Sequence, residues 1–117
     1  MDHLQIKNLP PDVREPILKA VQILIEHGPG GLVDAGLCGP STTPQEVDTM
    51  EEYLRDYPGD LVELPDSAEL WASVAPDGLW DIDLPLHNDR DGRMDLFLFL
   101  KVDPRHHSVT VTDLYAP

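Results

Sequence analysis

The chain contains few cysteines and few basic residues. Its 117 residues include one cysteine, Cys38, which excludes a disulfide-bonded scaffold and a zinc site built on cysteine pairs. Only 8 Lys and Arg stand against 22 Asp and Glu, and the resulting formal charge of −14 would repel phosphate backbones and anionic lipids. We therefore expect no binding to nucleic acid and none to membranes.

Long apolar runs are absent as well. No uncharged stretch approaches the roughly 18 residues typical of a membrane span, and residues 1–9 lack the cationic and apolar regions of a signal peptide. We expect a cytoplasmic protein, because a lone thiol fits a reducing compartment. The excess of Asp over Glu, together with 12 prolines, favours a bacterial genome rich in G and C.

Two segments have the periodicity of amphipathic helices. Apolar residues at three- and four-residue spacing predict a helix over about 12–27, with Asp12 as its N-cap and Glu15 completing a capping box. The run Thr43-Pro44-Gln45-Glu46 combines an N-cap threonine, a proline at the first helical position and a glutamate at the third. This run predicts a second helix over roughly 44–57.

The rest of the chain has the period of two that is typical of strands. Residues 69–75 fit a strand or a turn of helix, and Asp77-Gly78 predicts a hairpin turn. Strands are predicted over residues 61–64, 80–86, 94–102 and 107–115. The sequence therefore predicts an α+β fold, with two N-terminal helices packed on a three- to four-stranded antiparallel meander. We expect one domain over residues 1–117, with a helical part at about 12–57 and a sheet part at about 61–115.

The second half of the chain resembles a family of small bacterial domains of unknown function. In that family a strand beginning Gly-Arg-Ser-Asp-Leu precedes a closing strand ending Asp-Asp-Leu-His; the corresponding runs here are Gly92-Arg93-Met94-Asp95-Leu96 and Thr112-Asp113-Leu114-Tyr115. Upstream runs at 57–66 and 78–84 match the same pattern, so the resemblance covers roughly 44–117. More distantly, helices followed by a curved meander resemble the nuclear-transport-factor-2-like (cystatin-like) cone. That fold includes enzymes, ligand binders and immunity proteins, and so implies no particular function.

Acidic residues are concentrated in the middle of the chain. Residues 46–95 carry 15 acids and 3 bases, whereas residues 1–40 carry 5 acids and 3 bases. This distribution fits either a solvated face or a surface that steers a basic protein toward it. The acids expected to bind such a partner are Asp48, Glu51, Glu52, Asp56, Asp81, Asp83, Asp89, Asp91 and Asp95.

Other groupings of polar residues give no catalytic or metal site. Asp81 and Asp83 could share a cation or a proton, but they lie opposite a core face and are expected to face water. The run from Asp89 to Gly92 is similar to part of a calcium loop, yet His87 and Leu98 stand where such a loop needs acids. The five histidines lack metal-ligand spacing, and no glycine-rich phosphate loop follows a strand. We expect no catalytic residue, no metal and no cofactor.

The strand predicted at 94–102 is apolar on both faces. Its leucines at 96, 98 and 100 are expected to face the helices, which leaves Phe97 and Phe99 on the other side. That second face needs cover from the curvature of the sheet, from the N-terminal segment or from a second chain, so Phe97 and Phe99 are candidate interface residues. A homodimer through them would be opposed by the charge of −14 at low ionic strength.

Charge and pattern together favour a protein-binding function. The prediction is a non-catalytic acidic module, such as an immunity-type or regulatory partner whose acidic surface covers a basic protein. The alternative is a cone-fold small-molecule binder or enzyme with a pocket between helices and sheet. A closed apolar core would favour the first, and a deep pocket with His or Asp in it would favour the second.

Overall fold

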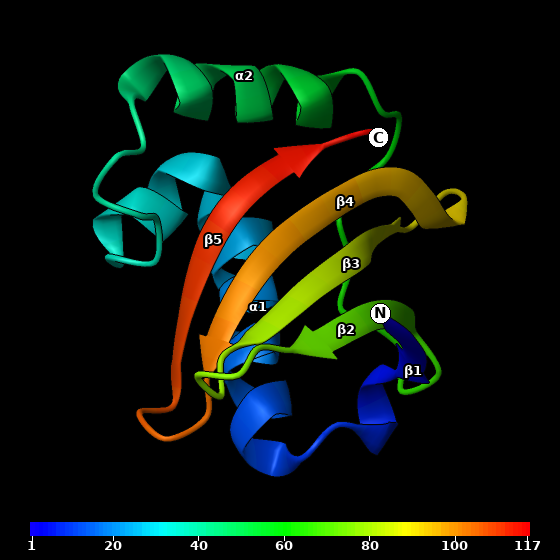
Figure 1. Cartoon of the computed structure of the whole chain (residues 1–117). Helices are drawn as coiled ribbons and strands as arrows, with labels where there is room; N and C mark the ends of the chain where they lie inside the picture. Colours follow the sequence, from blue (N-terminus) through cyan, green and yellow to red (C-terminus); the bar gives the residue numbers. More distant parts are fainter.

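A five-stranded antiparallel sheet is the frame of the protein, in a computed structural model that describes residues 1–117 (Figure 1). Each strand pairs with the next one along the chain, so the spatial order is the sequence order. The two helices are inserted between the first and second strands. The strands are β1 (Asp2–Gln5), β2 (Glu69–Val74), β3 (Trp80–Asn88), β4 (Gly92–Asp103) and β5 (Ser108–Tyr115).

The predicted α+β class is confirmed, but the number of strands is not. The chain has five strands rather than three or four, because its N-terminal residues form β1 at the edge of the sheet and Glu69–Val74 is a strand. The strand predicted at 61–64 is wrong: only Leu61 makes a single bridge, to Asn88. Prolines at positions 58 and 65 flank this segment, and proline cannot donate a hydrogen bond to a ladder.

The first helix, α1 (Pro11–Asp34), is longer than predicted and is kinked. Gly28 has a φ of +71°, a left-handed conformation that a side chain disfavours, and Pro29 starts a further helical turn after it. The predicted capping box at Asp12 is wrong, because the helix begins at Pro11 and no side chain caps it. The acidic Asp12 lies instead within the first turn, where a negative charge complements the helix dipole.

The second helix, α2 (Pro44–Arg55), begins where the sequence predicts. The Thr43 hydroxyl oxygen accepts a hydrogen bond from the Glu46 backbone N–H at 3.2 Å, so the N-cap is confirmed. This helix packs against β5 and α1. Neither helix combines the length and the apolar composition that crossing a bilayer requires.

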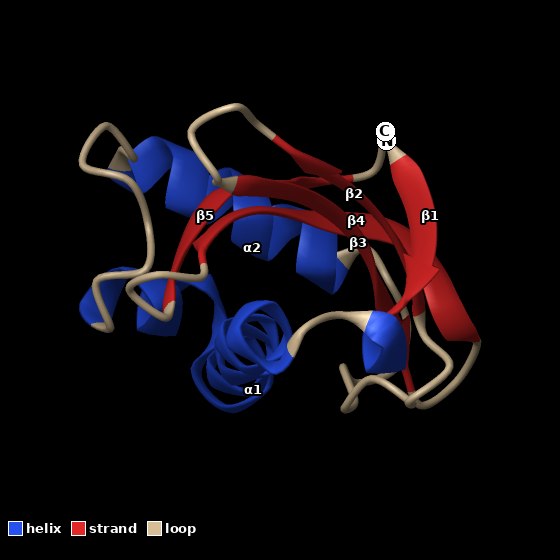
Figure 2. Cartoon of the chain, turned by 60° about the horizontal axis from the view of Figure 1, so that its bottom comes forward, coloured by secondary structure: helices blue, strands red, loops and turns tan.

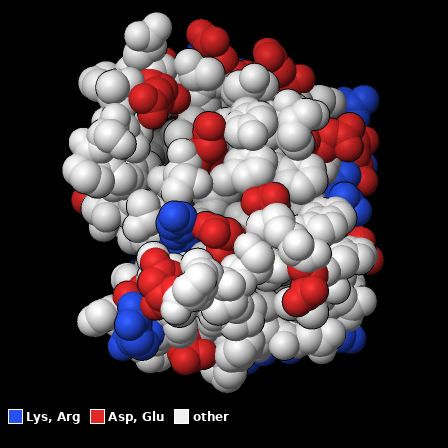
Figure 3. Space-filling view, in the orientation of Figure 1, with Lys and Arg blue, Asp and Glu red and all other residues white.

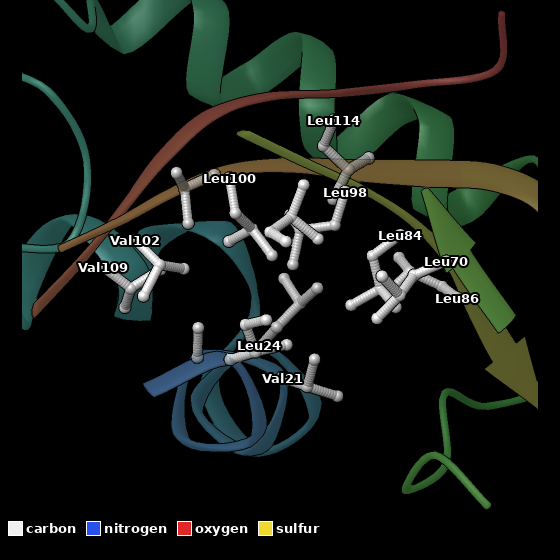
Figure 4. Packing of buried hydrophobic residues seen from close by; sticks show 14 of the residues in the cluster. Val21, Leu24, Leu70, Leu84, Leu86, Leu98, Leu100, Val102, Val109 and Leu114 are labelled. Carbon is white, nitrogen blue, oxygen red and sulfur yellow. The ribbon is translucent and has the colours of Figure 1, made fainter. Parts of the chain in front are cut away.

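One apolar core lies between α1 and the sheet, which bends over this helix (Figure 2). The core cluster contains 23 buried apolar residues, and Leu96, Leu98 and Leu100 are among them, as predicted. Figure 4 shows Leu98 and Leu100 pointing into this core. Asn88 is the one buried polar residue. Its side chain donates to the Pro58 carbonyl at 3.0 Å and accepts from the Asp91 N–H at 2.7 Å, so its nitrogen and its oxygen each have a hydrogen-bond partner.

Candidate functional site

The face of the sheet opposite α1 is covered by neither helix (Figures 1 and 2). Strand pairing places one row of outward residues across all five strands, because residues paired across a sheet share a face. We call this surface the open sheet face. Its outward residues include His3, Glu69, Trp71, Ser73, Asp81, Asp83, Arg93, Asp95, Phe97, Phe99, Lys101, Thr110, Asp113 and Tyr115.

Five rings form a continuous strip across the open sheet face. His3 stacks on Trp71 with 4.8 Å between ring centroids, and the centroids of Trp71 and Phe97 are 6.0 Å apart. Phe97 and Phe99 are 6.0 Å apart, and Phe99 stacks on Tyr115 at 4.7 Å. The side chains of Trp71, Phe97, Phe99 and Tyr115 are half-buried, and their exposed surface faces outward. The predicted second face of β4 is therefore an outer aromatic surface that the N-terminal segment flanks but does not cover.

Asp83 lies within this strip. It pairs across the sheet with Trp71 on one side and Phe99 on the other, which puts its Cβ about 4.5–5.5 Å from theirs. Burial raises the pKa of the Asp83 carboxyl above its ordinary value, and the charge of Asp81 raises it further. The Asp81 carboxylate has Lys101 Nζ at 3.9 Å, whereas Asp83 has no ion-pair partner. The sheet thus holds an unpaired carboxylate between aromatic rings.

Replacing Asp83 by asparagine is expected to stabilise the fold at pH 7. A folded-state pKa above the unfolded value means that charging Asp83 weakens folding, so stability is lost as the pH rises through the pKa. The melting temperature of Asp83→Asn should therefore exceed that of the wild type at pH 7 and match it at pH 3. The control is Glu52→Gln at an exposed position of α2, whose melting temperature should match that of the wild type at pH 7 and at pH 3. A lower melting temperature for Asp83→Asn at pH 7 would contradict the argument.

At the Trp71 end of the strip, a basic residue is held in place by this chain's own groups. The Arg93 guanidinium carbon lies 5.3 Å from the centroid of the Trp71 ring, and Arg93 Nη1 is 3.4 Å from Glu69 Oε2. The same Glu69 oxygen is 3.4 Å from His3 Nε2. Beside Arg93, the buried Nε2 of His87 has no hydrogen-bond partner; burial, and then the charge of Arg93, lowers the pKa of His87.

The nine acids predicted to bind a partner fall into three groups. The structure brings three of them to the open sheet face, leaves three on α2 and one directly after it, and puts two in the β3–β4 hairpin. Figure 3 shows acidic side chains scattered over this side of the molecule. A groove of about 240 Å³ between α2 and β5, lined by Glu46 and Tyr115 among others, joins α2 to the sheet. The groups are Asp81, Asp83 and Asp95 on the sheet, Asp48, Glu51, Glu52 and Asp56 on or next to α2, and Asp89 and Asp91 in the hairpin.

Asp89 has a structural contact. Its carboxylate oxygen accepts the Asp60 N–H at 2.9 Å, and its own N–H donates to the Asp60 carbonyl at 2.9 Å. Gly59 allows this approach, with a φ of +91°. A Cβ at Gly59 would lie 2.6 Å from the Asp89 carboxylate oxygen and 3.1 Å from Arg90 Cβ. These two hydrogen bonds therefore join the tip of the β3–β4 hairpin to the segment that follows α2.

We expect Gly59→Ala to lower the free energy of unfolding by about 1–3 kcal/mol, because it combines an unfavourable φ with a clash. Gly78→Ala is the matched control: its φ of +86° is similar, but nothing lies within 4 Å of the added Cβ. Urea denaturation should show a larger loss for Gly59→Ala than for Gly78→Ala. Equal losses would mean that the contact with Asp89 contributes nothing.

Sequence reasoning missed several residues of the open sheet face, among them His3, Glu69, Arg93 and Asp113. His3 lies on β1, which is too short and polar to carry a strand signal, and Glu69 lies in a segment of ambiguous pattern. Asp113 is two positions after the buried Val111, and in a regular strand residues two apart face the same side. Simple alternation would therefore put Asp113 on the core side. A bulge between Phe99 and Leu100 changes the register and turns Asp113 outward.

The remaining polar groups form no site of their own. No three His, Cys, Asp or Glu side chains are grouped so as to hold a metal ion. Cys38 lies beside β5, and burial raises the pKa of its thiol, which disfavours the thiolate. A hollow of about 370 Å³ lies between α1, the end of α2 and the start of β4, with the exposed Arg55 and Asp60 in its lining.

Fold and surface together define an α+β domain with one filled core and an uncovered aromatic and acidic sheet face. Residues 39–117 match the family described as Domain of unknown function (DUF7668), and the chain belongs to this family. No curated protein and no solved structure matches the chain. Membership agrees with the resemblance to a family of unknown function seen in the second half of the sequence. The matched region includes β2 to β5 and α2, and therefore nearly all of the open sheet face.

Proposed function

We propose that this protein is a non-catalytic binding module whose open sheet face docks on a basic protein, as an immunity-type or regulatory partner would. The observation that carries the proposal is the uncovered strip of stacked rings with unpaired acids among them. Of the acids on this face, Asp83 and Asp95 form no ion pair, and Asp113 only accepts the N–H of Leu114 at 2.8 Å. Aromatic rings supply buried area in an interface, and free carboxylates select a cationic partner.

The charge of the whole chain supports the same function. A net charge of −14 produces a field that attracts a basic protein from a distance, and complementary charge raises association rates by roughly 10–10³. The acids of α2, Asp48, Glu51, Glu52 and Asp56, are all exposed and add to this field beside the sheet. In the proposal they steer the partner, while the rings and Asp83 make the close contacts.

A small-molecule binder or enzyme of the cone fold is the alternative. Its support is the hollow that contains Arg55 and Asp60, where an anionic ligand could meet the arginine. Against it, the space between α1 and the sheet is filled by apolar side chains, and no ionisable residue is buried there. A catalytic acid or base ordinarily sits in a pocket with its nucleophile within hydrogen-bond reach. The closed core therefore favours protein binding.

The experiment is a pull-down from source cells followed by kinetics with the purified partner. The partner is expected to be basic, and association should slow when the ionic strength rises from about 0.01 M to 0.15 M, which shortens the Debye length from roughly 30 Å to 8 Å. The dissociation rate should change less, because the stacked rings are not screened by salt. A partner that binds at the same rate at both ionic strengths would contradict the proposal.

A further inference from the structure

The open sheet face already holds one arginine, its own Arg93. This guanidinium lies over the Trp71 ring, 5.3 Å from its centroid, and reaches Glu69 Oε2 at 3.4 Å. A planar cation on an aromatic face with a carboxylate at its edge is the environment that arginine prefers at protein surfaces. The chain therefore contains a working example of how this sheet binds a guanidinium.

A carboxylate and aromatic rings also lie side by side in the middle of the open sheet face, where no basic side chain of this protein pairs with the carboxylate. Asp83 lies directly across from Phe99, just as a carboxylate lies beside the Trp71 ring at the Arg93 site. Phe99 and Tyr115 stack at 4.7 Å, which presents a broad aromatic surface next to that carboxylate. Lys101, two positions along β4 from Phe99, pairs with Asp81, and no basic group forms an ion pair with Asp83.

We infer that the open sheet face binds an arginine side chain of the partner, with the guanidinium packed against the exposed surface of the Phe99 and Tyr115 rings and hydrogen-bonded to Asp83. This inference rests on the proposed function and specifies its chemistry: the partner presents arginine from an extended segment. An extended strand turns every second side chain to one side, so it can run along the sheet and place arginines over the rings. Two hydrogen bonds from one planar group to one carboxylate fix the orientation of the incoming chain.

Arginine suits this surface better than the other candidates. Lysine is a strongly hydrated point charge that neither stacks on a ring nor makes paired hydrogen bonds with a carboxylate. A second copy of the chain would bring another charge of −14 to the same face, with Asp83 of each copy close to acids of the other. Charge complementarity therefore selects an arginine-bearing partner over self-association.

The test compares two synthetic eight-residue peptides, one alternating arginine with serine and the other alternating lysine with serine. Their charge and length are equal, so any difference in affinity reports the guanidinium. In NMR titrations of the full chain at low salt, the arginine peptide should bind several-fold more tightly, because a guanidinium packs flat on aromatic rings and makes paired hydrogen bonds with a carboxylate. The shifts should centre on Phe99, Asp83 and the indole N–H of Trp71.

Two variants locate the preference. Phe99→Leu keeps an apolar side chain on the strand but removes the ring, and Asp83→Asn keeps the shape but removes the charge. Each variant should reduce the difference in affinity between the two peptides. The control is Leu18→Ala, which truncates an apolar side chain of α1 that is 38% exposed, and it should leave the preference for the arginine peptide unchanged. Unchanged melting temperatures or higher ones would show that the variants still fold.

Three results would overturn the inference. Equal affinity for the two peptides, or no binding of either, would mean that the face does not recognise arginine; if a basic partner still binds in a salt-dependent way, the proposed function survives. Shifts that centre on α2 would place binding elsewhere. A wild-type dimer in light scattering that Phe99→Leu makes monomeric would mean that a second copy occupies the face. Loss of both peptide binding and salt-dependent partner binding would also remove the proposed function.

Discussion

Truncation of Leu98 to alanine is expected to lower the free energy of unfolding by about 2–5 kcal/mol. Leu98 is fully buried in the middle of β4, where it lies between Leu84 on β3 and Leu114 on β5. Both β4 and β3 are paired on both sides, so the backbone around Leu98 and Leu84 is held by two ladders each and cannot move in to fill the cavity. The loss is therefore expected toward the upper part of the range, and urea denaturation with an unchanged m-value measures it.

The control for Leu98→Ala is Thr110→Ala on the neighbouring strand. Thr110 is exposed and pairs with Lys101, so its truncation removes little buried area. A change within about 0.5 kcal/mol is expected, as is usual at surface positions. If Leu98→Ala fell within the same limit, the core would not lie between α1 and this face of the sheet.

Reversal of two charges on the open sheet face is expected to slow association with the basic partner by about tenfold or more at low salt. The variant Asp83→Lys with Asp95→Lys changes two carboxylates that have no ion pair, so it breaks no contact within the fold. A lysine among the rings repels the cationic partner at the docking position as well as at a distance. Stopped-flow or surface binding measurements at about 0.01 M and 0.15 M salt would show the difference shrinking as salt rises.

The control reverses the same number of charges elsewhere. Glu15 and Asp34 are exposed on α1, which packs on the other face of the sheet. Each reversal adds two units, so both double variants carry −10 instead of −14, and only the position of the change differs. The Glu15→Lys and Asp34→Lys variant should bind at close to the wild-type rate. Equal slowing in both variants would mean that only net charge matters and that the open sheet face has no special role.

Part of the candidate site could be predicted from sequence alone. The alternation in β4 puts the leucines and the phenylalanines on opposite sides, so Phe97 and Phe99 were identifiable as an outer aromatic pair. Asp81 and Asp83 were identifiable in the same way on β3. Pattern could not say which rings from other strands would join them, because contact between Trp71, Phe97 and Tyr115 depends on the register of three separate strand pairs.

The acidic stretch shows the limit of reasoning from charge density. Residues 46–95 are dense in acids, but the fold spreads them over α2, the sheet and a hairpin tip. Asp89 is engaged with Asp60 and Asp81 with Lys101, whereas Asp83 is unpaired among rings. The density of acidic residues along the chain therefore predicts the sign of the surface charge. The role of each carboxylate depends on its tertiary contacts.

Composition and local pattern alone predict the negative charge, the helix capped by Thr43, the hairpin turn at Asp77-Gly78, and the faces of β3 and β4. Each of these depends on residues within a few positions of one another, where capping, turn geometry and alternation act directly. Three other features became visible only in the folded chain: the N-terminus adds β1 to the sheet, α1 continues past Gly28, and a bulge turns Asp113 outward. Those features depend on contacts between segments far apart in the chain, whose free energy no local pattern encodes.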